Sequence, residues 1–224
     1  MFESLKLSDL HESRTRILRA PSSTRPTLWG VEENGSKAVV KDFSKNGFLF
    51  RNFIGRFLIW RENKAYRRLK GLEGIPRIYG VIDGLAIVVE EIRGRNIEGL
   101  ERKNPLGETF FYDLWQLIEK IHDRGLAHCD LKRAPNILIG EDGKPYIVDW
   151  SASVSRSEFR FFPLNHIYRR FLEDDFNAVT KIKLTHIPDR VSPEERRRYY
   201  YRSKGEKMIR SIRDRLRELL QKVA

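Results

Sequence analysis

The chain has 224 residues, enough for one sizeable core or for two small lobes that share a cleft. Hydrophobic residues make up 40% of it, and no apolar run approaches about 18 residues, which argues against both a disordered chain and a membrane-spanning helix. The single cysteine excludes an internal disulfide and the usual multi-cysteine metal site, and without an evident export signal a cytoplasmic location is expected. The net charge of +12 favours an anionic partner: a nucleotide, a nucleic acid or a phospholipid surface.

Five short strands and one long helix are predicted in the first part of the chain. Turn signals, among them Asn34-Gly35 and Asp83-Gly84, bound strands over residues 15–20, 27–33, 37–43, 77–83 and 85–92. Between the third and fourth strands, residues 48–70 carry apolar side chains at helical spacing. The side chains that we expect to pack this helix on the sheet are Phe50, Phe53, Ile54, Phe57 and Leu58.

The second part of the chain is predicted to be mainly helical. Apolar residues over 110–121 lie on one face of a helix, and Gly125 is a suitable residue to end it. A short hairpin follows over 136–150, and helical patterns resume near residue 163. A further apolar stripe over 208–223 is typical of core packing.

In HCDLKRAPNILIGEDGKPYIVDW, residues 128–150, Asp130 precedes Asn136 by six residues, and Asp149 follows thirteen residues later, each beside a short apolar run. Transfer of a phosphoryl group from ATP needs aligned atoms and neutralised charge more than covalent help. Asp130 can accept the proton of an acceptor hydroxyl, while Asn136 and Asp149 supply the hard oxygen ligands that Mg²⁺ prefers. Lys132, two residues past Asp130, is placed to reach the transferring phosphate.

The same stretch resembles the catalytic loop and the metal-binding segment of protein-kinase-like phosphotransferases. The resemblance extends upstream, where AVVKDF looks like the strand that carries a phosphate-binding lysine, here Lys41. Glu62 stands where the helix glutamate that pairs with this lysine is expected. AIVVEEI looks like the strand that enters the hinge, with Val89 near the gatekeeper position and Glu90 to Ile92 facing adenine.

This resemblance, over roughly residues 14–150, implies a two-lobed protein-kinase-like fold of the α+β class. The N-lobe, residues 1–91, is expected to hold five strands and one long helix. The C-lobe, residues 92–224, is expected to be reduced, mainly helical and without a full activation segment, with the hinge near 91–96. The resemblance also implies ATP and Mg²⁺ as ligands, and a hydroxyl-bearing acceptor that is either a protein Ser/Thr or a lipid-linked sugar.

Two departures from the family concern the loops that hold phosphate. APSSTRPT occupies the position of the Gly-rich loop, so the backbone N–H groups and hydroxyls of Ser22, Ser23 and Thr24 are the expected phosphate donors. Asp130 and Asn136 are six residues apart, where the family usually has five. The loop must therefore bulge for Asn136 to reach the metal.

Two further departures concern activation. Cys129 replaces the arginine that usually precedes the catalytic aspartate, and Asp-Trp-Ser, starting at Asp149, replaces Asp-Phe-Gly, with no Ala-Pro-Glu after it. The missing arginine normally binds a phosphorylated activation loop, so we expect activity without loop phosphorylation. Both features occur in RIO-like kinases and in bacterial lipopolysaccharide kinases, and segments 21–43 and 164–183 look most like the lipopolysaccharide-kinase-like group.

Other polar residues near the motifs have simpler interpretations. His128 is expected to make structural hydrogen bonds within the loop. Cys129 is expected to be a small buried residue, because no base or second cysteine accompanies it. Asp174 or Asp175 is expected to anchor the catalytic loop from a neighbouring helix, with a solvated pair of acids as the alternative.

Two rival functions belong to other classes. A pseudokinase binds nucleotide without turnover; the absent Gly-rich loop favours it, and the retained catalytic and metal-binding residues oppose it. A nucleic-acid-binding module would use EERRRYYYRSKGEK, residues 194–207, whose basic and tyrosine side chains can contact phosphates and stack on bases. No nucleic-acid-binding motif accompanies this segment, so it ranks below the kinase.

The stretch FSKNGFLFRNFIGRFLIWRE, residues 43–62, interleaves aromatic with basic residues. Core packing explains most of the aromatic residues, but Leu49, Ile59 and Trp60 fall off the helix face predicted to be buried. Bulky apolar groups flanked by arginines suit the boundary of an anionic bilayer. We therefore expect peripheral binding to the inner face of the membrane, where a lipid-linked sugar is available.

Overall fold

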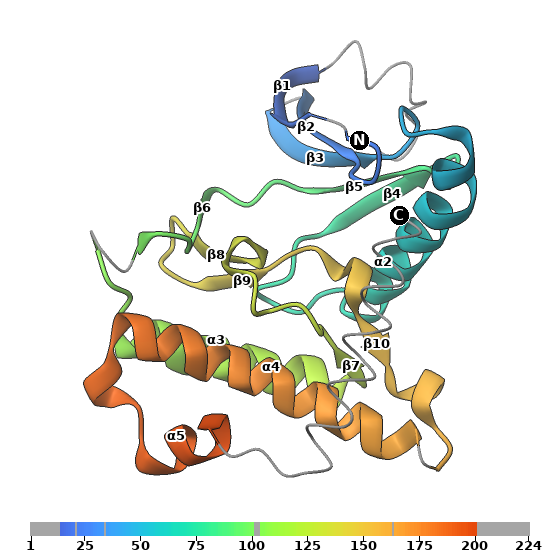
Figure 1. The fold of residues 1–224 in the computed structure, drawn as a ribbon. Helices are drawn as coiled ribbons and strands as arrows, with labels where there is room; N and C mark the ends of the chain where they lie inside the picture. Colours follow the sequence, from blue (N-terminus) through green and yellow to red (C-terminus); the bar gives the residue numbers. More distant parts are fainter. Residues whose placement is uncertain (1–13, 21, 34, 101–103, 163, 201–224) are drawn as a thin grey trace.

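Figure 1 shows the computed structural model of the chain, which describes residues 14–20, 22–33, 35–100, 104–162 and 164–200. A sheet with one helix forms one end of the molecule, and a mainly helical part forms the other. The predicted two-lobed α+β architecture is therefore confirmed. The apolar stripe over 208–223, and the basic segment beyond Tyr200, lie outside the described residues.

The five strands predicted for the N-lobe pair into one antiparallel sheet. In order across the sheet they are β1 (Arg14–Arg19), β2 (Thr27–Glu33), β3 (Ser36–Asp42), β5 (Ala86–Glu90) and β4 (Ile78–Ile82). Positive φ angles at Asp83 and Gly84 turn the second hairpin where the sequence predicts it. Lys41 pairs with Ile87 across β3 and β5, and alternation along β3 puts its side chain on the face opposite Val40.

The long helix of the N-lobe starts with a π-helical turn, η2 (Phe50–Gly55), and continues as α2 (Arg56–Arg68). The residues that α2 buries are Ile59, Glu62, Ala65 and Tyr66. Phe53 is 68% exposed and Phe57 is 48% exposed, so the predicted buried face was wrong at these two positions, while the other three are half-buried. Ile59, predicted to fall off that face, is 1% exposed, so this prediction was wrong as well. The π turn explains the error, because its i→i+5 bonds rotate every later residue relative to an uninterrupted α-helix.

The C-lobe is built on helices α3 (Glu108–Asp123), α4 (Leu164–His186) and α5 (Pro193–Tyr200). Its short strands are β6 (Gly94–Asn96), β7 (Leu126–Ala127), β8 (Ile137–Gly140), β9 (Pro145–Ile147) and β10 (Val154–Ser155). β8 pairs with both β6 and β9, and β7 pairs with β10. Single 3-10 turns are η4 (Ala134–Asn136), η5 (Trp150–Ala152), η6 (Arg156–Phe159) and η7 (Pro188–Arg190). Gly125, at φ 71°, ends α3 as predicted.

One hydrophobic cluster joins the two lobes. It includes Ile59 and Tyr66 from α2 and Ile87 from β5, together with Leu114 from α3 and the fully buried Trp150 from η5. α2 therefore packs on the C-lobe as well as on its own sheet, and the lobe boundary near the hinge stays a prediction. Among the described helices, none is both long and apolar enough to cross a bilayer.

Candidate active site

The predicted catalytic loop runs from β7 to β8, and its two polar residues meet. Asn136 donates its side-chain amide to the backbone oxygen of Asp130 at 3.0 Å and to Asp130 Oδ2 at 3.1 Å. Two successive turns absorb the extra residue: the Arg133 N–H donates to the Asp130 oxygen at 3.2 Å, and the Asn136 N–H donates to the Arg133 oxygen at 3.0 Å. The loop between Asp130 and Asn136 is therefore folded into turns, and the contact of Asn136 with a metal stays a prediction.

A buried carboxylate on α4 holds the start of this loop. Asp175, 2% exposed, accepts the backbone N–H groups of His128 at 2.7 Å and Cys129 at 2.9 Å. Its Oδ2 also lies 3.1 Å from His122 Nε2. These donors compensate the carboxylate for its lost contact with water. Of the two residues predicted to anchor the loop, the structure confirms Asp175.

His128 has the structural role predicted for it, whereas Cys129, predicted to be buried, is half-buried. The Asp130 N–H donates to His128 Nδ1 at 3.3 Å, so Nε2 carries the ring proton and donates to the Val148 carbonyl at 3.0 Å. The ring packs edge-on against Trp150 at a centroid distance of 4.6 Å. Cys129 adopts φ 68°, which is rare for a residue with a side chain. Burial raises the pKa of its thiol well above the ordinary value, so the thiol is a poor nucleophile.

Lys41 joins the helix glutamate to the segment predicted to bind the metal. Its Nζ donates to Glu62 Oε2 at 2.8 Å and to Asp149 Oδ1 at 2.7 Å, and only 10% of its side chain is exposed. Burial alone lowers the pKa of Lys41, but the carboxylates of Asp149 and Glu62 outweigh it and hold this pKa above its ordinary value. The predicted pairing of Lys41 with Glu62 is therefore confirmed, and the lysine is charged.

Asp149 follows β9 in a left-handed conformation, with φ 63°, that is uncommon for residues other than glycine. Its Oδ1 also accepts the Ser151 hydroxyl at 2.7 Å. Burial raises its pKa, but Lys41 outweighs burial and holds the pKa well below the ordinary value. The Val148 N–H donates to the Asn136 carbonyl at 3.0 Å, so the two predicted metal ligands lie on adjacent backbone segments.

Asp130 is suited to accept a proton. Burial raises its pKa above the ordinary value, while Arg133, whose Nη1 lies 3.6 Å from Asp130 Oδ2, acts against burial. About a quarter of its side chain, 24%, remains exposed, so an acceptor can approach it. A carboxylate whose pKa is raised toward the working pH is a better general base.

Lys132, predicted to reach the transferring phosphate, extends toward α4. Its Nζ lies 3.7 Å from Asp174 Oδ1, and Arg170 Nη2 lies at the same distance from that oxygen. With 41% of its side chain exposed, Lys132 keeps room to move. Its contact with phosphate stays a prediction.

The turn between β1 and β2 occupies the position of the Gly-rich loop. The Ser22 N–H donates to the Arg25 carbonyl at 3.2 Å, and the Arg25 N–H donates to the Ser22 carbonyl at 3.4 Å. The buried amide of Asn46 donates to the carbonyl oxygens of Ser22, Ser23 and Arg25 at 2.8, 3.3 and 3.1 Å. Asn46 therefore fixes a turn that contains no glycine. Phosphate binding by Ser22, Ser23 and Thr24 stays a prediction.

Arg19, the last residue of β1, is a candidate that sequence reasoning missed. Within the described residues its Nε is buried without a hydrogen-bond partner. Burial lowers the pKa of Arg19, the carboxylate of Asp149 acts against burial, and Arg25 and Arg133 lower the pKa further. An arginine donor left unsatisfied within electrostatic reach of Asp149 fits a phosphate oxygen. Its only signal in the sequence is its position just before the PSSTRP turn.

These residues fit Mg-ATP. The described part of the chain has no group of three or more His, Cys, Asp or Glu side chains that could hold a metal ion by itself. Mg²⁺ commonly binds through one or two protein side chains together with substrate phosphates. Asn136 and Asp149 would form such a short ligand set, and Lys41 and Arg19 would supply positive donors for the phosphates.

The last residue of β5 and the first residue after it both have their backbone amides bonded within the N-lobe. The Glu90 N–H donates to the Arg77 carbonyl at 2.8 Å, and the Glu91 N–H donates to the Lys37 carbonyl at 3.1 Å. The Glu90 carboxylate accepts the Arg77 N–H at 3.0 Å. The adenine-binding roles predicted for Glu90 and Ile92 stay predictions.

Comparisons with known proteins identify similar chains. The family model of the RIO domain matches residues 51–182. The serine/threonine-protein kinase PknD of Chlamydia caviae is 33% identical over 90 residues, which are 40% of this chain and 10% of that protein. The probable serine/threonine-protein kinase fnkB of Dictyostelium discoideum is 27% identical over 148 residues, 58% of this chain and 28% of that protein. The 3-deoxy-D-manno-octulosonic acid kinase of Xylella fastidiosa is 25% identical over 149 residues, 59% of each chain. The chain thus matches less than two thirds of the length of each relative.

Proposed function

The chain belongs to the RIO domain family, within the protein-kinase-like superfamily, and from this premise we propose that it is an ATP- and Mg²⁺-dependent phosphotransferase acting on a hydroxyl acceptor. The observation that carries the proposal is the bonding of Lys41 to both Glu62 and Asp149. This one contact joins the phosphate-binding, helix and metal-binding motifs, which lie far apart in the sequence. Relatives named as kinases support the same reaction class.

In this proposal each residue has a separate task. Asp130 orients the acceptor hydroxyl and accepts its proton as the new O–P bond forms, while the bond between the γ-phosphorus and the bridging oxygen of ADP breaks and ADP leaves. Lys41, positioned by Glu62, binds the ATP phosphates. Asn136 and Asp149 are the residues that hold Mg²⁺, which, when bound, neutralises phosphate charge.

A pseudokinase is the second candidate, because the turn that replaces the Gly-rich loop has no glycine. Transfer of labelled phosphate from ATP to protein and lipid fractions of the host cell distinguishes the two. We expect transfer by the unchanged protein and almost none by Asp130→Ala. Nucleotide binding without transfer to any fraction supports the pseudokinase and contradicts the proposed reaction. The nucleic-acid-binding alternative has no support from the described residues or from the relatives.

Of the two acceptor classes, we propose the lipid-linked sugar ahead of protein Ser/Thr. The relative named as a 3-deoxy-D-manno-octulosonic acid kinase matches the largest share of its own length, 59%, whereas the two protein kinases match 10% and 28% of theirs. Label that enters the lipid fraction supports this choice. Label that enters only protein supports the other acceptor class.

A surface beside α2 supports action at a membrane. The aromatic patch consists of the exposed residues Phe48, Leu49, Phe53, Phe57 and Trp60. Arg51 lies over the Phe48 ring at 5.6 Å, and Lys45 and Arg56 are exposed beside the patch. Apolar groups among cations are complementary to an anionic bilayer. We therefore place the protein in the cytoplasm, bound peripherally to the inner face of the membrane.

A further inference from the structure

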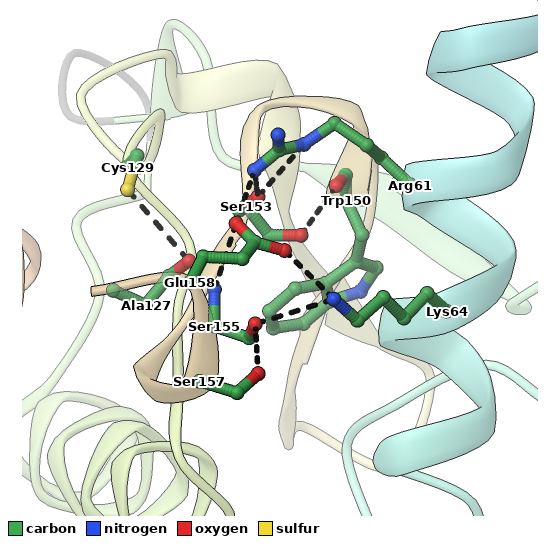
Figure 2. Close-up of polar contacts among 9 residues, drawn as sticks. All are labelled: Arg61, Lys64, Ala127, Cys129, Trp150, Ser153, Ser155, Ser157 and Glu158. Carbon is green, nitrogen blue, oxygen red and sulfur yellow. Dashed lines mark hydrogen bonds and ion pairs between the residues drawn. The ribbon is translucent and has the colours of Figure 1, made fainter. Parts of the chain in front are cut away.

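Two cations of α2 reach the segment that follows Asp149, as Figure 2 shows. Arg61 donates to the Ser153 carbonyl from Nη2 at 2.6 Å and from Nε at 3.2 Å. Its Nη2 also lies 3.1 Å from Glu158 Oε2, and Lys64 Nζ lies 2.8 Å from Glu158 Oε1. One carboxylate therefore pairs with two basic side chains that are one helical turn apart. We call these three residues the Glu158 clasp.

Glu158 is itself fixed in the C-lobe. It lies in η6, where it forms a capping box with Ser155: each side chain accepts a hydrogen bond from the backbone N–H of the other. Ser155 belongs to β10, which pairs with β7 just before the catalytic loop. The carboxylate is thus attached to the sheet that carries the loop, and Lys64 also reaches the Ser155 hydroxyl at 3.4 Å.

The clasp is sheltered from water. The exposed fractions of the side chains are 27% for Glu158, 18% for Arg61 and 35% for Lys64. Burial raises the pKa of Glu158, but Lys64 and Arg61 outweigh burial and hold this pKa below its ordinary value. Glu158 is therefore ionised at neutral pH. Without its charge, two like charges three residues apart on α2 would repel each other.

The clasp connects the two sides of the Lys41 site. Glu62, next to Arg61 on α2, bonds Lys41 from the helix side. Asp149, at the start of the segment that Glu158 holds, bonds Lys41 from the other side. Because Lys41 bonds both carboxylates, any movement of α2 away from this segment separates the groups that Lys41 joins.

We propose that Glu158 is a positioning residue for the phosphotransfer. Its carboxylate holds α2 against the segment that follows Asp149. In a protein whose segment is phosphorylated, the phosphate group would perform the same task. The negative charge is built into the chain, so Glu62 stays bonded to Lys41 without any modification. This inference rests on the proposed function, and Glu158 acts through α2 rather than on the reacting atoms.

The test removes the charge and keeps the size of the side chain. We expect Glu158→Gln to lower kcat/KM for ATP about tenfold, because a charge-assisted hydrogen bond is lost. The matched control is Glu194→Gln. In the unchanged protein the Glu194 carboxylate pairs with Arg198 at 2.6 Å on α5, away from the site. We therefore expect this variant to leave kcat/KM unchanged. The double variant Glu62→Gln with Glu158→Gln should have a kcat/KM less than about twofold below that of Glu62→Gln alone, because both changes affect the same contact.

If Glu158 only stabilised the fold, the result would differ. The fold-loss in kcat/KM caused by Glu158→Gln would then multiply with the fold-loss caused by Glu62→Gln. A multiplicative loss, or full activity of Glu158→Gln, overturns the inference. Should Glu158→Gln fail to fold, Lys64→Gln takes its place: about a threefold loss supports the clasp, and full activity overturns it. Should the unchanged protein transfer no phosphate, the proposed function fails separately. Calorimetry then tests the clasp, because unchanged ATP affinity in Glu158→Gln overturns it.

Discussion

The side-chain amide of Asn136 donates to the carboxylate of Asp130 at 3.1 Å, so a proposed metal ligand touches the proposed base. An asparagine side chain has a donating nitrogen and an accepting oxygen. Because the nitrogen of Asn136 is bound to Asp130, its oxygen is left for Mg²⁺, the partner that prefers oxygen ligands. The contact therefore gives the two residues separate tasks, and separate tasks should be distinguishable by mutation.

Asp149→Ala should weaken the binding of Mg-ATP, because an oxygen ligand of the metal is lost. Asp130→Ala should leave this binding nearly intact and lower turnover by roughly 10²- to 10⁴-fold, the contribution of a general base. Calorimetry with Mg-ATP, together with initial rates, measures both effects. Loss of nucleotide binding in Asp130→Ala, with binding retained in Asp149→Ala, would show that the assignments are reversed.

The rate should depend on pH through Asp130. Its carboxylate is the active form, so kcat/KM should fall as the pH falls through the pKa of Asp130, which burial raises above the usual value of about 3.9. Arg133 acts against this rise, so Arg133→Gln should move the acid limb of the profile to higher pH. A limb that stays in place in Arg133→Gln, or moves to lower pH, contradicts the role of Asp130.

Arg19→Gln should raise the KM for ATP about tenfold, because a charged donor to phosphate is lost. The matched control is Arg67→Gln on α2, an exposed arginine whose Nε bonds Asn63 at 3.1 Å. Steady-state kinetics at varied ATP concentration compares the two variants. Equal KM values for Arg19→Gln and the unchanged protein would mean that Arg19 does not bind nucleotide.

The core of the candidate site could be predicted because its residues stand in short motifs with fixed spacing. Asp130 and Asn136 are six residues apart, and the strand before Asp149 reads clearly in the sequence. Lys41 and Glu62 could be paired through the resemblance to protein-kinase-like phosphotransferases, which implies a lysine on a strand and a partner glutamate on the helix after it. Local motifs and this resemblance therefore found these residues, and the fold brings them together.

The rest depends on contacts that local patterns do not contain. Glu158 pairs with cations more than 90 residues earlier in the chain. Arg19 becomes a candidate donor to phosphate only because the fold places it within electrostatic reach of Asp149. The exposure of Phe53 and Phe57 depends on a π turn, which apolar spacing does not reveal. These features arise from tertiary packing and from one change of helix geometry.

Protein treated with phosphatase during purification should transfer phosphate as fast as untreated protein. The Glu158 clasp supplies the negative charge beside α2, and Cys129 stands where an arginine would bind a phosphorylated loop. Initial rates of the two preparations, with mass spectrometry to verify removal of phosphate, test this. A large loss of rate after treatment would show that a modification is required.

The aromatic patch should bind the protein to anionic vesicles, and high salt should weaken this binding, because each basic residue near such a surface contributes about 1 kcal/mol. Leu49, Phe53, Phe57 and Trp60 are all exposed, and the Phe57 and Trp60 rings stack with centroids 5.9 Å apart. Phe50 is unsuitable for mutation because it packs against the buried Phe43, with ring centroids 6.1 Å apart.

Phe53→Ser with Trp60→Ser should weaken co-sedimentation about tenfold, since burial of each large apolar side chain contributes about 1.5–3 kcal/mol when complete. Tyr112→Ser, an equally exposed aromatic on α3, is the control and should bind like the unchanged protein. Protein that remains in the supernatant with anionic vesicles at low salt contradicts the membrane proposal and makes a soluble protein the better candidate acceptor.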